Sequence, residues 1–221
     1  MSEVVRGRLL SSAKIHKVFE CWQQECPQPQ GELVYASHYE LLVAVILSAQ
    51  ATDVAVNKAC STLFLVANTP ETMLDLGEEG LKKYIRQIGL YNNKAKNIIA
   101  MSQVLLERFS SAVPSSFTEL CALPGVGRKT ANVVLQMAFA QPVIAVDTHV
   151  FRVARRLGLS NGNTPDRVED DLMRCVPQSY RYYAHHWMIL HGRYVCKARR
   201  PECERCRLVS LCRYASTNRL C

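Results

Sequence analysis

The segment Leu123-Pro124-Gly125-Val126-Gly127-Arg128-Lys129-Thr130-Ala131 is the most informative part of this 221-residue chain. It lies between two segments whose apolar residues recur at helical spacing. Its two glycines allow a tight turn, after which backbone amides point outward at a helix N-terminus. Unpaired amides and the positive end of the helix dipole attract anions. The stretch therefore predicts two helices joined by a hairpin that binds an anion. On a basic protein, the natural anion is a DNA phosphate.

The hairpin is not a nucleotide-binding P-loop. That motif requires four residues between its first glycine and the Gly-Lys-Ser/Thr group, and it follows a β-strand. Neither condition holds here. A phosphate contact by this hairpin would position DNA without reading its sequence.

Helical signals continue on both sides of the hairpin. The segments Ser37–Glu40 and Ser116–Glu119 read as capping boxes, and no segment alternates apolar and polar residues over strand length. The expected N-terminal caps are Ser37, Asp53, Thr69, Ser116 and Thr164, and the expected C-terminal glycines are Gly77 and Gly89. The fold class is therefore expected to be all-α, with helices joined by short loops.

Four of the chain's 10 cysteines gather near the C-terminus with the spacing Cys-x6-Cys-x2-Cys-x5-Cys. They are Cys196, Cys203, Cys206 and Cys212. Such clustering favours a metal or cluster site, because the ligands must surround one group. Structural zinc favours paired Cys-x2–4-Cys knuckles, and only one such pair exists here. From the residues alone, zinc and an iron–sulfur cluster both remain open.

The charge of the chain is +8, and most of it lies around these cysteines. Residues 191–221 hold eight basic and two acidic side chains, which is a net +6. This surplus favours a polyanionic partner, although part of it can balance the charge of the thiolates. The N-terminus lacks a secretory segment, and the longest apolar run, Leu41–Leu47, is too short to cross a membrane. We therefore expect a cytoplasmic protein with no membrane partner. In the cytoplasm, clustered cysteines bind metal more often than they form disulfides.

These features together resemble the helix-hairpin-helix DNA glycosylase superfamily and, within it, the endonuclease III family. The matching stretches are Leu123–Ala131, Val146–His149, Leu47–Asp53, Ile88–Asn92, His185–Tyr194 and the cysteine loop. The resemblance covers most of the chain. It implies two helical domains, residues 31–141 with the hairpin and residues 1–30 plus 142–221 with an iron–sulfur cluster loop. It also implies that the four cysteines hold a [4Fe–4S] cluster of structural role.

The resemblance implies a bifunctional enzyme of base excision repair. Such an enzyme removes oxidised pyrimidines from duplex DNA and cleaves the strand 3′ to the abasic site by β-elimination. Lys129 is then the nucleophile that forms a Schiff base, and Asp147 stabilises positive charge on the sugar. Attack requires a neutral amine, which we expect desolvation and the helix N-terminus to favour. The structural alternatives are a phosphate-binding lysine and an aspartate that only caps a helix at residues 148–157.

The same resemblance assigns the DNA contacts. Gln50 fills the void left when the damaged base leaves the stack, and Leu90 is a wedge in the opposite strand. Phosphate contacts are expected from Gly125, Gly127, Arg128, Lys197, Arg199 and Arg200. The expected partner is double-stranded DNA with damaged pyrimidines or abasic sites. The protein is expected to be a monomer, associated with the nucleoid if bacterial.

Two other readings compete with this one. An adenine-removing mismatch glycosylase shares the hairpin and the cluster, but usually lacks the lysine and carries a further C-terminal domain. This chain ends nine residues after Cys212. A non-catalytic iron–sulfur protein that binds DNA or senses redox state leaves the pair Lys129 and Asp147 unexplained.

Overall fold

The computed structural model describes residues 7–218 and is helical throughout, with no β-strand in that range. The all-α prediction is confirmed. The chain divides into two compact units. Unit 1 combines the N-terminal segment through Gly31 with the C-terminal segment from Pro142, and unit 2 spans Glu32–Gln141.

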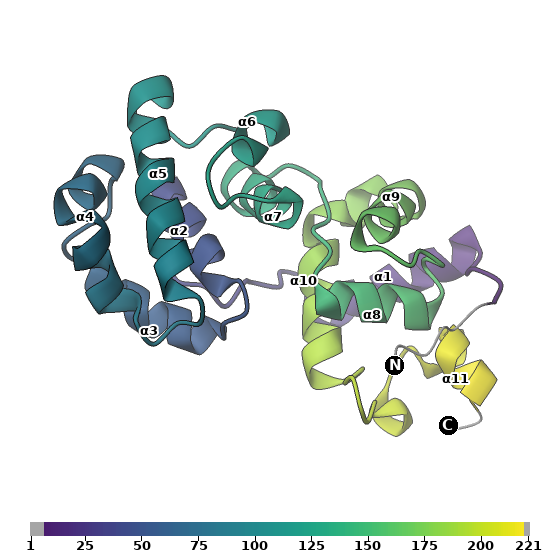
Figure 1. Ribbon diagram of the computed structural model, residues 1–221. Coiled ribbons are helices and arrows are strands. Elements are labelled where there is room, and N and C mark those ends of the chain that lie inside the picture. The colour runs from purple at the N-terminus through teal and green to yellow at the C-terminus, as the bar shows by residue number, and fades with distance from the viewer. Residues whose placement is uncertain (1–6, 219–221) are drawn as a thin grey trace. The chain divides into compact units, whose positions relative to one another are not determined.

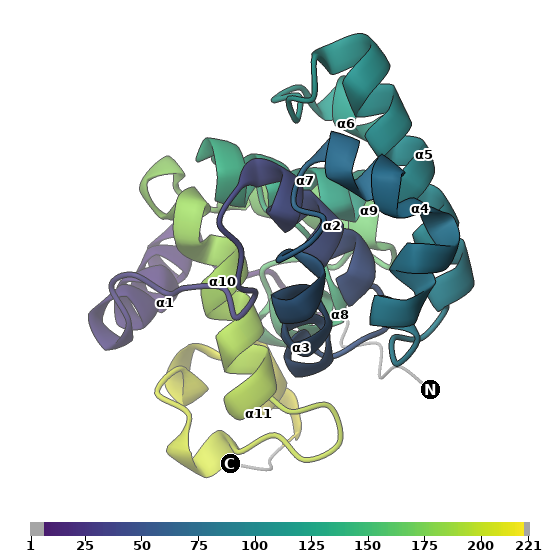
Figure 2. The same ribbon diagram turned by 90° about the vertical axis from the view of Figure 1, so that its left-hand side faces the viewer.

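Unit 2 is built around a buried helix, α2 (His38–Ser48), whose residues from Tyr39 to Leu47 are all buried. A helix that is apolar on every face must be covered by others. The covering helices are α3 (Asp53–Leu63), α4 (Pro70–Ile85), α5 (Tyr91–Phe109), α6 (Phe117–Cys121) and α7 (Arg128–Phe139). Helices α3, α5 and α7 pack directly on α2, and α4 packs along α5 (Figures 1 and 2).

Unit 1 is centred on α10 (Gln178–Tyr194), which packs against α8 and α1 (Figure 1). The other helices are α1 (Ser12–Glu25), α8 (Thr148–Leu157), α9 (Pro165–Cys175) and α11 (Arg213–Asn218), with 3-10 turns η1 (Cys203–Arg205) and η2 (Val209–Leu211). Four aromatic rings cluster in the core: Phe19 contacts Trp22, Tyr180 and Trp187, and the last two also contact each other. Because α1 supplies half of these rings, the N-terminal helix is part of the same core as the cysteine loop that follows α10.

Three of the expected helix caps are confirmed. The hydroxyls of Ser37, Thr69 and Thr164 each accept a hydrogen bond from the backbone N–H three residues on. The box at Ser37 differs in one detail, because the Glu40 carboxylate accepts from the N–H of Ala36. These caps satisfy amides that have no partner inside their helices.

Most other expected ends of helices are wrong. Thr52 caps α3, and Asp53 is its first residue. Ser116 precedes α6 without a side-chain cap bond. The helix end expected at Gly77 is confirmed, because this residue, with φ of 68°, lies at a kink that divides α4 into two helical segments. Gly89 lies beyond the end of α4, which the structure places at Ile85.

Candidate functional site

The hairpin between α6 and α7 is anchored by two buried side chains, Leu123 and Val126. Gly125 has φ of 78°, and a Cβ there would lie 2.8 Å from the Cβ of Asn97. Only glycine fits this position, for reasons of both conformation and space. A Cβ at Gly127 would meet nothing within 4 Å, so the backbone at the start of α7 is open to a ligand. No side chain caps α7, so its first N–H groups can donate hydrogen bonds to an anion.

Lys129 is the second residue of α7, and its side chain is exposed. The expected desolvation of this amine is wrong for the DNA-free protein, because a residue in the first turn of a surface helix points into solvent. Arg128 precedes it, and its guanidinium lies 5.4 Å from the centre of the Phe117 ring. Both cationic side chains therefore stand at the open end of the hairpin in unit 2.

Asp147 lies in unit 1, where it caps α8. Its Oδ1 accepts a hydrogen bond of 2.7 Å from the N–H of Val150. Two residues earlier, the carbonyl of Ala145 lies 2.8 Å from Nδ1 of the buried His185. The segment that leads to Asp147 is thus held at both ends, which fixes the half-buried carboxylate in one orientation.

Gln50 and Leu90 come together in unit 2. A Cβ built on Gly89 would lie 3.7 Å from the Gln50 carbonyl oxygen, so the two loops are adjacent. Both residues have left-handed backbones, with φ of 56° and 61°, and both side chains are exposed. A left-handed backbone is uncommon outside glycine and persists where its surroundings impose it. At 57% exposure, Leu90 is a large apolar side chain presented to solvent.

A third residue beside these loops, Lys94, was not among the residues expected at the site. Its Nζ donates to the carbonyls of Leu47 and Ala49 at 2.9 Å and 2.6 Å. It is buried at 5% exposure. Its position four residues before Ile98 places it on the apolar face of α5, and a lysine on such a face is the signal that could have identified it.

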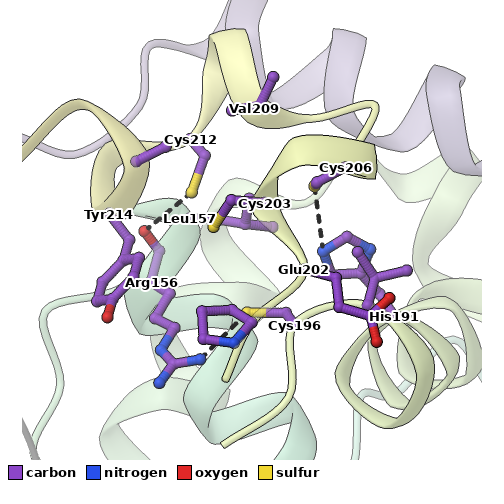
Figure 3. A pocket seen from close by; sticks show the side chains of 13 residues that line it. Arg156, Leu157, His191, Cys196, Glu202, Cys203, Cys206, Val209, Cys212 and Tyr214 are labelled. Carbon is purple, nitrogen blue, oxygen red and sulfur yellow. Dashed lines mark hydrogen bonds between the residues drawn. The ribbon is translucent and has the colours of Figure 1, made fainter. Parts of the chain in front are cut away.

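The four cysteines of the C-terminal loop line one cavity in unit 1, and Figure 3 shows their sulfur atoms facing the same space. The remaining wall is largely apolar and includes Leu157, Val195, Pro201, Val209, Tyr214 and Ala215. Within residues 7–218, no three His, Cys, Asp or Glu side chains form a group that would hold a single metal ion. The thiols instead stand around a shared cavity, which fits a group of several atoms such as an iron–sulfur cluster.

The immediate surroundings of the thiols are ordered by α8 and α10. The guanidinium of Arg156 lies 3.5 Å from the Cys196 sulfur and donates to the carbonyls of Lys197 and Ala198, each at 2.8 Å. Burial raises the pKa of the Cys206 thiol to about 11. This ligand would therefore need a bound cation to remain a thiolate at neutral pH.

His191 also contacts the cysteine cavity. The indole of Trp22, which can only donate, points at Nδ1 of His191 at 3.4 Å. In the neutral ring, the proton is consequently on Nε2, which faces the Cys206 sulfur at 3.9 Å (Figure 3). Burial lowers the pKa of His191 to about 4, so the ring is neutral at physiological pH.

The basic residues of the cysteine loop differ in their availability to a ligand. Lys197 and Arg205 both form ion pairs with Glu202. Arg199 and Arg200 are exposed on the same loop. These two arginines are the stronger candidates for phosphate contacts, because the charge of Lys197 is already offset.

The chain is similar to proteins of known sequence and structure. Residues 43–178 match the family model described as HhH-GPD superfamily base excision DNA repair protein. The chain is 58% identical to endonuclease III of Treponema pallidum (strain Nichols) and 52% identical to that of Escherichia coli (strain K12). Each alignment covers 93% of this chain and 97% of the relative.

A solved structure is also similar. It is described as a trapped endonuclease III–DNA covalent intermediate, estranged-adenine complex. It superposes with a TM-score of 0.89 at 44% identity and covers 94% of this chain and 98% of its own. None of the helices within residues 7–218 combines the length and the apolar character needed to span a membrane.

Proposed function

The chain belongs to the HhH-GPD superfamily of base excision DNA repair proteins and, within it, to the endonuclease III family, and we propose that Lys129 and Asp147 perform its chemistry on oxidised pyrimidines. Its reaction class is that of a DNA glycosylase and AP lyase, and its partner is DNA. The observation that carries the residue assignment is the exposed Lys129 amine at the uncapped N-terminus of α7. That a similar protein was trapped in a covalent complex with DNA supports a nucleophile of this kind.

The proposed reaction begins when the neutral amine of Lys129 attacks C1′ of the damaged nucleotide. The C1′–base bond breaks and the base leaves with a proton. The C1′–O4′ bond of the sugar then opens, O4′ takes a proton, and a Schiff base joins Nζ to C1′. A proton is then removed from C2′, and the bond between C3′ and its phosphate oxygen breaks, which is the β-elimination. Because Lys129 is exposed in the free protein, the removal of water from the amine would accompany DNA binding.

Asp147 would stabilise positive charge and transfer protons. A carboxylate near the sugar stabilises the positive charge that develops there as the base leaves. It can also accept or return a proton at the amine or the sugar. Its cap bond to Val150 leaves the second carboxylate oxygen, Oδ2, for this purpose. Capping and catalysis are therefore compatible roles for one side chain.

Gln50 and Leu90 are proposed to enter the duplex. A base that leaves the stack must be replaced, or the void costs stacking energy. The exposed Leu90 side chain and the adjacent polar Gln50 stand on two neighbouring loops, so one movement onto DNA can insert both. Gly125, Gly127 and Arg128 would hold phosphate at the hairpin, and Lys197, Arg199 and Arg200 at the cysteine loop.

Cys196, Cys203, Cys206 and Cys212 are proposed to hold a [4Fe–4S] cluster. When bound, the cluster would supply a rigid closure of the loop that carries Arg199 and Arg200. The fit rests on four thiols around one largely apolar cavity. Purified protein should be yellow-brown and contain about four iron atoms, as expected for four thiolate ligands. Colourless protein with one zinc atom would contradict the proposal.

The catalytic proposal is tested with labelled duplexes that contain a single lesion. We expect wild type to excise thymine glycol and nick the strand, and to leave adenine opposite guanine intact. Lys129→Ala should lose both steps. Excision of the mismatched adenine without action on thymine glycol would favour the mismatch-glycosylase reading instead. We further propose that units 1 and 2 are the two expected domains and that the protein is monomeric, which gel filtration of the purified holoprotein checks.

A further inference from the structure

Lys94 is a buried lysine without an acidic partner. Its exposure is 5%, and within residues 7–218 no carboxylate forms an ion pair with it. Burial alone lowers its pKa. A buried ammonium is costly unless it is hydrogen-bonded, so the acceptors that Lys94 finds decide whether it can occupy this position.

The ammonium of Lys94 binds the backbone on the near side of Gln50. Helix α2 ends at Ser48, and the last carbonyls of a helix have no partner within it. Lys94 donates to two of them, those of Leu47 and Ala49. The Ala49 carbonyl belongs to the same planar peptide unit as the Gln50 nitrogen. Holding that oxygen therefore fixes one side of the left-handed Gln50 backbone.

The main chain of Lys94 binds the other loop. Its N–H donates to the carbonyl of Leu90 at 3.1 Å, which is the first hydrogen bond of α5. Leu90 has no side-chain cap bond and has φ of 61°. One residue thus contacts the backbone at both exposed positions, through its side chain at one and through its amide at the other.

We propose that Lys94 is a positioning residue that holds Gln50 and Leu90 at the spacing needed to enter the duplex together. This inference rests on the DNA roles proposed above for those two side chains. Lys94 itself is buried, so it acts through the loops and not by contact with DNA. Its loss should impair the steps in which a base leaves the stack. It should spare the chemistry at Lys129, which lies on a different helix.

The first test is Lys94→Met, which removes the donors and keeps most of the side-chain length. We expect excision of thymine glycol from duplex DNA to fall by about 10- to 100-fold, because a displacement of about 1 Å has effects of this size. Cleavage of a single-stranded abasic oligonucleotide, which has no stack to open, should stay within about twofold of wild type. Lys96→Met, on the exposed face of the same helix, is the matched control and should behave as wild type.

A double-mutant cycle separates positioning from general destabilisation. In the background Gln50→Ala/Leu90→Ala, Lys94→Met should add less than about a twofold further loss, since the side chains it positions are absent. A full additional loss in that background would overturn the inference. If Lys94→Met does not fold, as judged by thermal melting, Lys94→Arg takes its place in the same cycle. Arginine keeps the charge but displaces the donors, and the same non-additivity is expected.

The outcomes for the two proposals are distinct. Wild type that neither excises thymine glycol nor nicks the strand contradicts the proposed function. Wild type that does both, together with a Lys94→Met variant of equal duplex activity, contradicts only the role of Lys94.

Discussion

The carboxylate of Asp147 accepts a hydrogen bond of 2.7 Å from the N–H of Val150, and this contact starts helix α8. The same helix carries Arg152 and Arg156 one and two turns further on. Arg152 donates to the carbonyl of Cys196 at 3.0 Å, and Arg156 to that of Lys197 at 2.8 Å. Within unit 1, one helix therefore connects the proposed catalytic carboxylate to the cysteine loop.

Substitution of Asp147 should separate capping from catalysis. Asparagine is as good an N-cap as aspartate, whereas alanine loses about 1 kcal/mol. We expect Asp147→Asn to keep the melting temperature of wild type and to lose glycosylase activity by at least about 100-fold, the order found when a group that stabilises transition-state charge is removed. Asp147→Ala should have a lower melting temperature and should also lose glycosylase activity. Thermal melting and single-turnover excision check this, and an active Asp147→Asn would leave Asp147 as a cap only.

Arg156 should control how firmly the cysteine loop retains the proposed cluster. Arg156→Met removes the donors to Lys197, Ala198 and Cys196, together with the guanidinium contact to the Tyr214 ring. Loss of groups that orient ligands typically weakens metal binding by about 10- to 100-fold. We expect a chelator to remove iron about 10- to 100-fold faster from this variant than from wild type, as measured by absorbance.

The matched control for Arg156 is Arg167→Met, an exposed charge on α9. Its iron loss should follow wild type. Equal rates for Arg156→Met and wild type would show that the loop holds its shape without the Arg156 bonds.

Arg199 and Arg200 should account for part of the salt dependence of DNA binding. Each phosphate contact contributes about 0.9 to the slope of log K against log salt. Arg199→Ala/Arg200→Ala should therefore reduce the slope by about 1.8. Lys197→Ala should have a smaller effect, because Glu202 already pairs with this lysine. Both effects are checked by measuring binding to a duplex with a tetrahydrofuran abasic analogue at several salt concentrations. An unchanged slope in the double variant would show that these arginines do not contact DNA.

The sequence predicted those parts of the fold whose cause is local. The caps at Thr69 and Thr164 follow from a hydroxyl placed before a proline, and the structure contains both. Asp147 was expected at the start of α8 for the same local reason. Ser116 shows the limit of such patterns, because it has the right spacing but makes no cap bond.

Features that depend on tertiary contacts were not predictable in this way. The left-handed backbone of Gln50 follows the Ala49 carbonyl, which accepts a hydrogen bond from Lys94 on the distant helix α5. The exposure of Lys129 depends on how the residues around the start of α7 pack, which its sequence motif does not specify. Arg156 carries no motif of its own, and only the fold reveals that it reaches the loop 40 residues away.

Stability in mild acid should depend on His186. Burial, and secondly the neighbouring charge of His185, lower its pKa from about 6.5 to about 4. Between these values the unfolded chain binds a proton that the folded chain does not, so the stability present above pH 6.5 is lost as pH falls towards 4. The loss from this group is roughly 3 kcal/mol. His186→Gln should flatten the dependence of unfolding free energy on pH in this window, as urea unfolding at a series of pH values would measure. A variant with the slope of wild type would show that His186 does not titrate on unfolding.

The central assignment is Lys129 as the nucleophile, and borohydride trapping tests it most directly. Holoprotein is incubated with a duplex that contains one thymine glycol, and borohydride then reduces the C=N bond of any Schiff base to a stable amine. We predict a covalent protein–DNA adduct with wild type and with Lys96→Ala, an exposed lysine that serves as control, and none with Lys129→Ala. An adduct formed by Lys129→Ala in the yield of wild type would contradict the assignment.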